Sequence, residues 1–370
     1  MKIAFVVHDY HRGGGHGRYV VELAERFGRE NDVHIFANTF SSEGYTAVRF
    51  HHVPACRLTA LTTILTFLPG TRKIGSEFDI IHAQGLCSLK SDIITSHICT
   101  RGWFNARKAA ERKLPMKDYV FEAAISPLEK HLYSNVSKPV IAVSDKVRDD
   151  LARFYGRSRN VEVIHHGIDL IRFAPSNRAS WRRTVRSQLA IRDSDFVFLF
   201  IGDLRKGASA TIEALARLPK GKLLLVSHTV AAPYVEMARR FGIADRVLFS
   251  PATPAIERIY AACDAFVFPT PYDAFGMVVA EAMASGIPVI TSREAGVAEW
   301  ITHDVNGILL DSPRDSAQLS QYMLRILQSP ETCEMFAGAA RSTVEHHGWD
   351  SVARSTMQLY ETVVSNGKRE

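Results

Sequence analysis

The stretch AFVFPTPYDAFGMVVAEAMASGIPVITS, residues 265–292, carries the pattern that decides the fold class. AFVFPTPY is predicted to be a strand and DAFG a loop, MVVAEAMASG a helix that ends at Gly286, and IPVIT the next strand. A short apolar strand that leads through one helix into another apolar strand is typical of a parallel sheet with helices on both faces. The stretch therefore predicts an α/β protein.

The same alternation runs through the rest of the chain in two series. Residues 1–170 contain strand-like runs such as KIAFVV, DVHIFA and DIIHA, and a second series from FVFLFIG to GILL follows. Two series predict two doubly wound, Rossmann-like domains, which we place at residues 1–175 and 190–348. The polar, arginine-rich stretch 172–195 contains the predicted boundary, and the last helix, 349–366, can pack back on the first domain.

The basic residues are unevenly distributed along the chain. Residues 1–175 hold 24 Lys and Arg against 18 Asp and Glu, whereas residues 176–370 hold 21 of each kind. An excess confined to one half indicates an anionic partner there, such as phosphate, an acidic glycan or a membrane surface. Scattered surface charge is the alternative. No nucleic acid is expected as a partner.

Cysteine usage indicates a cytoplasmic protein with reduced thiols. The five cysteines are odd in number and lack CxxC spacing, which argues against a disulfide framework and against a zinc site. The uncharged stretch 58–71 has 14 residues and is too short and too polar to span a bilayer. The start MKIAFVVHDY reads directly as a strand and not as a signal peptide.

Two loops that follow predicted strands could hold an anionic ligand. RGGGHGR, residues 12–18, follows the first strand, and its glycines would let a ligand approach the backbone at a helix N-terminus. It lacks the GxGxxG spacing of a dinucleotide site, and a plain strand-to-helix turn is the alternative. IGDLRKG, residues 201–207, places Arg205 and Lys206 before a helix, where they could cradle a diphosphate or simply face solvent.

Two acids bracket the helix of the opening stretch. Asp273 lies in the loop, and Glu281 lies among apolar neighbours, where a carboxylate is costly unless it is hydrogen-bonded. One interpretation is a capping aspartate plus a structurally paired glutamate. The other is a long ligand that offers hydroxyls to one acid at each end and a charged middle to the helix N-terminus. A nucleotide sugar has that layout.

Several motifs together resemble those of the family 4 glycosyltransferases, which are retaining, depend on nucleotide sugars and have the GT-B fold of two Rossmann-like domains facing a central cleft. The motifs are GGHGR at 14–18, VIAVSDKVRDDLARFYG followed by VEVIHHGIDLIRFAP, IGDLRKG, DAFGMVVAEAMASGIPVI and REAGVAEWI. The likeness runs along the full chain. It is greatest to the subgroup that adds glucose to the inner core of lipopolysaccharide.

The resemblance implies a role for each matching residue. Glu281 would hold the donor ribose and Asp273 the transferred sugar, while Arg205 and Lys206 would stabilise the leaving diphosphate. His97 falls where the family places an acceptor-side polar residue, and we count it as a catalytic candidate, although a structural histidine is equally compatible. The remaining donor-binding candidates are Gly14, Gly15, Phe275, Gly276, Met277 and Val278. No metal or other cofactor is expected, and retention of configuration is implied only by the family.

The basic segment 101–117 is a candidate acceptor or membrane site. It contains six basic residues against Glu111 alone, with Trp103 and Phe104 beside them. Such a segment can dock on an anionic membrane or bind a phosphorylated acceptor, and a solvated helix face is the alternative. The candidates are Arg18, Trp103, Arg107, Lys108, Arg112 and Lys113.

This chain departs from the family pattern at four places. Asp273 replaces the first glutamate of the paired-acid motif, Asp203 replaces an arginine, and His166 replaces an asparagine. LLLVSHT lacks the usual glycines.

The predicted function is transfer of a hexose from a nucleoside-diphosphate sugar to a glycan, lipid-linked or lipopolysaccharide-type acceptor, in the cytoplasm or peripherally on the inner membrane face. A nucleotide-sugar epimerase or another non-transferase enzyme of the same fold, such as a phosphorylase, is the alternative. A binding protein without activity is a third.

Overall fold

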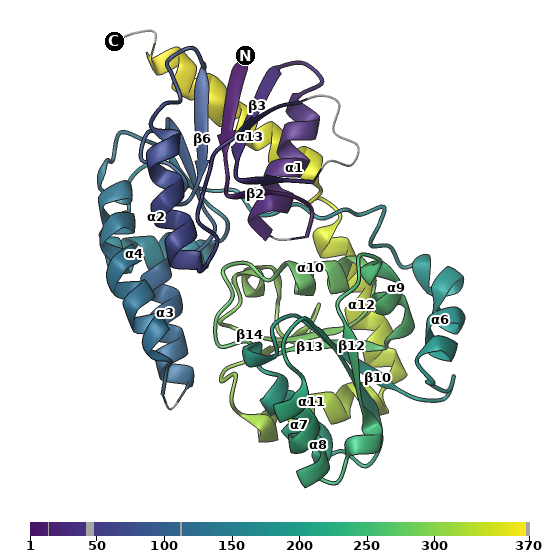
Figure 1. Ribbon diagram of the computed structural model, residues 1–370. Coiled ribbons are helices and arrows are strands. Elements are labelled where there is room, and N and C mark those ends of the chain that lie inside the picture. Colours follow the sequence, from purple (N-terminus) through teal and green to yellow (C-terminus); the bar gives the residue numbers. More distant parts are fainter. Residues whose placement is uncertain (14, 42–47, 112, 368–370) are drawn as a thin grey trace. The chain divides into compact units, whose positions relative to one another are not determined.

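Buried parallel strands form the centre of each half of the chain in the computed structural model, which describes all residues except 14, 42–47, 112 and 368–370. The chain divides into unit 1, residues Met1–Gly167 with Trp349–Glu370, and unit 2, residues Ile168–Gly348 (Figure 1). Each unit has its own parallel sheet with helices around it, so the prediction of two Rossmann-like α/β domains is confirmed. Gly14 and Arg112 of the predicted site lie outside the described residues.

Unit 1 is built on a seven-stranded parallel sheet in the order β5-β3-β1-β6-β7-β8-β9. The strands are β1 Lys2–Val6, β3 Asp32–Ala37, β5 Val48–His52, β6 Ile80–Gln84, β7 Ile93–Ser96, β8 Val140–Ala142 and β9 Val161–Val163. A short parallel pair, β2 Asp9–Tyr10 and β4 Thr39–Phe40, lies apart from this sheet. The helices are α1 Gly15–Phe27, α2 Ala60–Thr71, α3 Thr100–Ala110, α4 Met116–Ser134, α5 Asp145–Tyr155 and α13 Trp349–Gly367.

The C-terminal helix α13 belongs to unit 1 (Figure 1). The Tyr360 hydroxyl lies 2.6 Å from His82 Nδ1 on β6, and His82 Nε2 lies 2.6 Å from the Thr95 hydroxyl on β7. Arg26 on α1 forms an ion pair with Asp350 at 2.6 Å. Because burial holds the pKa of His82 down to about 3, its imidazole is neutral at pH 7 and can serve as both donor and acceptor in this chain of contacts.

Unit 2 is built on a six-stranded parallel sheet in the order β12-β11-β10-β13-β14-β15. The strands are β10 Val197–Ile201, β11 Lys222–Ser227, β12 Val247–Pro251, β13 Ala265–Phe268, β14 Val289–Ser292 and β15 Ile308–Leu310. The α-helices are α6 Asn177–Gln188, α7 Ala208–Ala216, α8 Ala232–Arg240, α9 Ile256–Ala262, α10 Met277–Ala284, α11 Ser316–Gln328 and α12 Pro330–Val344. Short 3₁₀ turns are η1 Leu204–Lys206, η2 Ala244–Arg246 and η3 Gly296–Trp300.

The arginine-rich stretch that the sequence indicated as the boundary forms α6 within unit 2. Arg178, Arg182 and Arg186 all contact the Asp264 carboxylate, at 2.8, 2.7 and 2.7 Å. Asp264 also accepts the Val197 backbone N–H at 2.8 Å, and the Arg186 side chain is only 1% exposed. The arginines therefore attach α6 to the amino ends of the central strands β10 and β13 by partly buried charge pairing, although in sequence the stretch has the pattern of a polar linker.

Strand order gives each sheet a switch point. In unit 1 the chain runs from β1 outward to β5 and returns to β6 beside β1; in unit 2 it runs from β10 to β12 and returns to β13 beside β10. At such points the loops that leave adjacent strands diverge and leave a ligand crevice at the carboxyl ends. Ligand sites are therefore expected at the residues just after β1 and β6 in unit 1 and just after β10 and β13 in unit 2.

Candidate functional site

An ion pair joins the two loops at the switch point of unit 2. Lys206 follows β10 in η1, Asp273 follows β13, and Lys206 Nζ lies 2.7 Å from Asp273 Oδ2. Both side chains are partly exposed, at 38% and 18%. Gly207 permits this approach because its φ is +115° and a Cβ there would lie 2.4 Å from the Pro269 carbonyl oxygen. The structure thus brings together two residues that the sequence proposed separately.

Arg205 lies in the same loop but is held by Asp203. Its Nε lies 3.0 Å and its Nη2 2.5 Å from the Asp203 carboxylate, which also accepts the Arg205 backbone N–H at 3.0 Å. Partial burial raises the pKa of Asp203, but the hydrogen bonds from Arg205 outweigh it and the net pKa is lowered. Asp203, a departure from the family pattern, therefore partly neutralises the cation that would meet a diphosphate.

The loop before α10 is shaped by Asp273 and by Gly276. Asp273 Oδ1 accepts the Phe275 backbone N–H at 3.2 Å, and Gly276 has a φ of +95°, at which a side chain would be strained. The Phe275 ring packs edge-on against Trp300 at 5.1 Å. Met277 and Val278 begin α10, where helix geometry leaves backbone N–H groups without intrahelical acceptors. This helix start can therefore receive an anion.

Glu281 lies inside α10 and is 6% exposed. The Tyr260 hydroxyl of α9 lies 3.1 Å from Glu281 Oε2 and 2.9 Å from the Val278 carbonyl oxygen. Tyr260 thus orients the carboxylate that the paired-acid motif assigned to the donor. Sequence reasoning missed Tyr260, because its helix reads only as an apolar run, AIERIYAACD, without a local signal.

A hollow of ≈ 200 Å³ lies at the carboxyl ends of β11 and β12. Its walls include Leu204 and Phe249 together with the polar side chains of Ser227, Thr229 and Ser250. The Thr229 hydroxyl lies 3.3 Å from Asp203 Oδ1, so the hollow adjoins the Arg205 loop. Apolar walls with a few polar groups suit a flat heterocycle.

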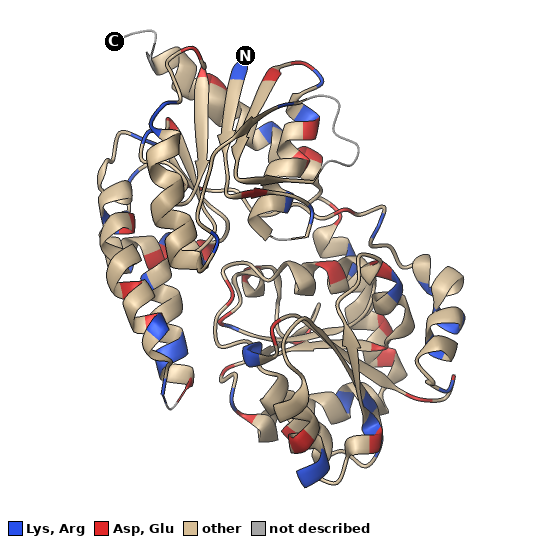
Figure 2. Ribbon diagram, in the orientation of Figure 1, with Lys and Arg blue, Asp and Glu red and all other residues tan. Residues whose placement is uncertain are grey.

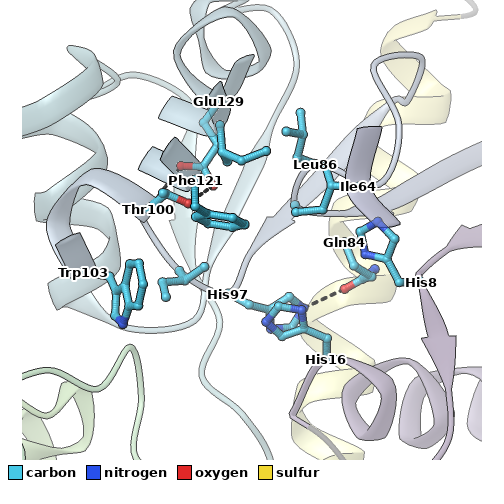
Figure 3. Close-up of a pocket in the computed structure, with 13 residues that line it drawn as sticks. His8, His16, Ile64, Gln84, Leu86, His97, Thr100, Trp103, Phe121 and Glu129 are labelled. Carbon is cyan, nitrogen blue, oxygen red and sulfur yellow. Dashed lines mark hydrogen bonds between the residues drawn. The ribbon is translucent and has the colours of Figure 1, made fainter. Parts of the chain in front are cut away.

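Unit 1 contains a pocket of ≈ 290 Å³ at its own switch point (Figure 3). His8 comes after β1, Gln84 ends β6 and His97 comes after β7, so three strand ends supply one side of the pocket. Trp103 and Phe121 from α3 and α4 line it as well. Of the predicted acceptor-side residues, His97 and Trp103 are brought together here, and Gln84 is an addition that its position at a strand end could have revealed.

His97 is 5% exposed, and its Nε2 lies 2.8 Å from Gln84 Oε1 (Figure 3). His16 stacks on it at 4.3 Å. Burial, with His16 and His166 nearby, holds the pKa of His97 well below its ordinary value, so the ring is neutral at pH 7. With Nε2–H donated to Gln84, Nδ1 is a hydrogen-bond acceptor, and it makes no hydrogen bond within the described part of the chain.

The glycine loop leads into α1, and a second hollow of ≈ 240 Å³ lies against it. Gly15 lines this hollow and begins the helix. Gly17 packs tightly, because a Cβ there would lie 2.6 Å from the His11 carbonyl oxygen. Arg18 is half-buried one residue later. The loop is therefore a turn with an open approach at Gly15, compatible with either interpretation of its glycines.

Arg107 does not form part of an exposed basic surface. It is 9% exposed, its Nη1 lies 2.6 Å from Asp118 on α4, and its Nε lies 2.9 Å from Glu111. The guanidinium also lies over the Trp103 ring at 5.0 Å. Arg107 therefore links α3 to α4, which corrects its place among the membrane candidates. Lys108 and Lys113 are exposed at this end of the α3–α4 pair, where basic and acidic residues are interspersed (Figure 2).

Among the described residues, no group of three or more His, Cys, Asp or Glu side chains could hold a metal ion. Within the same residues, no helix is both long and apolar enough to cross a bilayer.

Comparison with known proteins covers most of both units. The family model described as Glycosyltransferase Family 4 matches residues 13–172, and the model described as Glycosyl transferases group 1 matches residues 182–343. A D-inositol 3-phosphate glycosyltransferase of Xylanimonas cellulosilytica is 25% identical over 394 aligned residues, which cover 94% of this chain and 91% of the relative.

Two solved structures show the same fold. WaaG, a glycosyltransferase involved in lipopolysaccharide biosynthesis, has a TM-score of 0.82 at 20% identity, covering 97% of this chain and 99% of that one. HepE of Anabaena in complex with UDP-glucose has a TM-score of 0.75 at 19% identity, covering 98% and 100%. The predicted resemblance is confirmed: the chain belongs to the family 4 glycosyltransferases and has the GT-B fold.

Proposed function

We propose that this glycosyltransferase transfers a hexose, with retention of configuration, from a nucleoside-diphosphate sugar bound in unit 2 to a glycan or lipid-linked acceptor of the cell envelope. The observation that carries the proposal is the Lys206–Asp273 pair at 2.7 Å. It places a cation and a hydroxyl-binding carboxylate side by side at the carboxyl ends of β10 and β13, where doubly wound sheets bind ligands.

The donor fits unit 2 as an ordered series of contacts. The nucleobase occupies the hollow at β11 and β12, and Glu281, held by Tyr260, accepts the ribose hydroxyls. The diphosphate meets Lys206, Arg205 and the start of α10. Asp273 then receives hydroxyls of the transferred sugar. Since the aspartate is one methylene shorter than the family's glutamate, the sugar lies closer to the β13 loop.

To accelerate this transfer, the protein must stabilise the leaving diphosphate. As the glycosidic C–O bond breaks, negative charge grows on the β-phosphate oxygen, and a fixed cation stabilises this charge more than the ground state. Lys206 is suited to this because it is already held in place by Asp273. The acceptor hydroxyl forms the new C–O bond on the same face as the departing diphosphate, whose oxygen takes the hydroxyl proton, so the configuration is retained without a protein nucleophile.

The comparisons support this proposal in several ways. HepE was solved with UDP-glucose, which supports a donor of that chemical class. WaaG acts in lipopolysaccharide biosynthesis, which supports a cell-envelope role. Both matched family models describe glycosyltransferases, and the Xylanimonas relative is named as one. These matches therefore give the epimerase alternative no support.

Calorimetry with UDP, GDP and ADP tests the donor assignment, and incubation of the preferred nucleotide sugar with acceptors, followed by NMR of the product's anomeric proton, tests the reaction. We expect one diphosphate to bind and the product to keep the donor's configuration. Binding of none of the three, or an inverted product, would contradict the proposal.

We expect transfer to continue without divalent metal. Arg205 and Lys206 supply positive charge that a metal ion provides in other transferases, so removal of metal leaves the leaving group stabilised. Initial rates measured with excess EDTA should match untreated rates within about twofold. A loss of activity that Mg²⁺ or Mn²⁺ restores would show that the donor diphosphate needs a metal.

We also propose peripheral binding to the inner face of the cytoplasmic membrane through two exposed lysines, Lys108 on α3 and Lys113 in the connection between α3 and α4. The double variant Lys108→Gln, Lys113→Gln should bind anionic vesicles with roughly thirtyfold lower affinity, measured by co-sedimentation. The reason is that each basic residue near such a surface contributes about 1 kcal/mol. Raising the salt concentration should weaken binding of the unmodified protein as well.

The matched control changes two exposed arginines of unit 2, Arg239 and Arg240, to Gln. This control removes the same charge but should leave vesicle binding intact. Equal losses in both variants would mean that only net charge matters, and undiminished binding in the first variant would leave α3 and α4 as a solvated surface.

A further inference from the structure

The unit 1 pocket has two chemically different sides (Figure 3). Aromatic rings of Trp103 and Phe121 form one side, at a centroid distance of 6.3 Å and nearly perpendicular to each other. Aliphatic side chains continue this wall, namely Ile64, Leu86, Ile98 and Ile125. His16, Gln84 and His97 lie together at the other side. A ligand of this pocket must therefore be amphipathic.

The polar side has hydrogen-bonding capacity that the described part of the chain does not use. Gln84 and His97 are bonded to each other, yet Gln84 Nε2 and His97 Nδ1 have no partner there, and both residues are at most 5% exposed. Buried polar atoms are normally paired, and an unpaired one has a free-energy cost. Gln84 Nε2 can donate to a ligand oxygen, and His97 Nδ1 can accept from a ligand hydroxyl. Because Nδ1 lies across the ring from the nitrogen that bonds Gln84, the two atoms match two separate hydroxyl groups.

The charge of the pocket excludes one class of ligand. No Lys or Arg is among the described residues that line it. Burial lowers the pKa of His8 and that of His16 to about 4 and holds the pKa of His97 well below its ordinary value, so none of the three supplies a positive charge at pH 8. Glu129 lies at the wall, where it accepts hydrogen bonds from Thr100 and Tyr155. Whether Glu129 is protonated or ionised, no described side chain of this lining carries a positive charge that could compensate a phosphate.

We infer, building on the proposed transferase function, that this pocket binds the acceptor as an uncharged, amphipathic glycoside. One sugar hydroxyl accepts from Gln84 and a second donates to His97, while the apolar body, either an aglycone or the apolar face of a sugar ring, packs on Trp103 and Phe121. A sugar phosphate is excluded from this pocket. On this assignment the acceptor belongs to another chemical class than the inositol 3-phosphate in the name of the Xylanimonas relative. The donor chemistry proposed for unit 2 is unchanged.

Saturation-transfer NMR tests the inference directly, with phenyl and hexyl β-D-glucosides and β-D-galactosides as probes, and with glucose and D-myo-inositol 3-phosphate as comparisons. Experiments at pH 8 keep the histidines neutral. We expect saturation transfer to the phenyl or hexyl protons and to the sugar, weak transfer to free glucose, and none to the inositol phosphate. Trp103→Ala and Phe121→Ala should each weaken glycoside binding roughly tenfold, because each removes a large apolar surface.

Three further variants separate loss of pocket contacts from structural disturbance and from nonspecific binding. Trp103→Phe should recover most of the binding, which separates loss of the aromatic wall from disturbance of Arg107, whose guanidinium lies over the indole. Phe241→Ala, an exposed aromatic residue of unit 2, should leave binding unchanged. His97→Ala should weaken binding of the glycosides and should not change binding of UDP.

Calorimetry with UDP, GDP and ADP on the same samples separates this inference from the proposed function. If one diphosphate binds, the acceptor assignment alone is overturned by equal glycoside binding in all variants, by no binding of any glycoside, or by preferred binding of inositol phosphate. If none of the three diphosphates binds the unmodified protein, the donor proposal is contradicted instead.

Discussion

Lys206→Ala should lower kcat roughly 10²–10³-fold while changing the affinity for the donor much less. Lys206 faces the position where charge develops as the diphosphate leaves, and removing one such contact typically costs about 3–4 kcal/mol in the transition state. The structure adds a second cost, since Lys206 Nζ lies 2.7 Å from Asp273 and its loss leaves that carboxylate without its cation. Steady-state kinetics, with donor affinity measured separately by calorimetry, resolves the two effects.

Lys220→Ala is the matched control, because Lys220 is an exposed lysine of the same unit that lies after α7. It should retain full turnover. Lys206→Arg keeps the charge but changes its geometry, so intermediate turnover would show that position matters as well as charge. Unchanged turnover in Lys206→Ala would remove this lysine from the mechanism.

The placement of the unit 2 site could be predicted from the sequence because strand periodicity identifies strand ends, and ligand loops follow strand ends in doubly wound sheets. Lys206 and Asp273 were each recognised in this way. Their direct pairing could not be predicted, because 67 residues separate them and no local pattern encodes the approach. That approach depends on Gly207, whose φ of +115° brings the η1 loop against Pro269.

Charge patterns were less reliable than strand patterns. The segment 101–117 has six basic residues against one acidic residue, but Asp118 is the next residue and binds Arg107 at 2.6 Å. Likewise, Arg178, Arg182 and Arg186 read as a linker and converge on Asp264. In both cases a long side chain reaches an acid on another element, so its exposure cannot be judged from neighbours in sequence.

Tyr260 shows a different limit of sequence reasoning. Its hydroxyl contacts Glu281 from α9, yet an aromatic residue in an apolar helix indicates only burial. The paired-acid motif therefore identifies the carboxylate, while the group that orients it depends on how α9 and α10 pack.

Asp273→Asn and Glu281→Gln should remove contacts to opposite ends of the donor. Glu281 accepts hydroxyls of the ribose, which does not react, and charge-assisted hydrogen bonds are about twice as strong as neutral ones. Glu281→Gln should therefore weaken nucleoside diphosphate binding, by roughly tenfold or more. Asp273 contacts the sugar and also holds Lys206. Its replacement by Asn removes a competing anion from the lysine, so the bare diphosphate should bind with equal or higher affinity.

Transfer from the complete donor should nevertheless fall roughly 100-fold in Asp273→Asn, because the sugar loses its carboxylate and Lys206 loses the group that fixes its position. Calorimetry with the bare diphosphate and a transfer assay with the nucleotide sugar examine the two ends of the ligand separately. Asp311→Asn is the control, since Asp311 is an exposed aspartate of unit 2 that pairs with Arg293. If Asp273→Asn weakens the bare diphosphate as much as Glu281→Gln does, the two acids do not mark opposite ends of one donor, and the ion pair with Lys206 serves to build the diphosphate site.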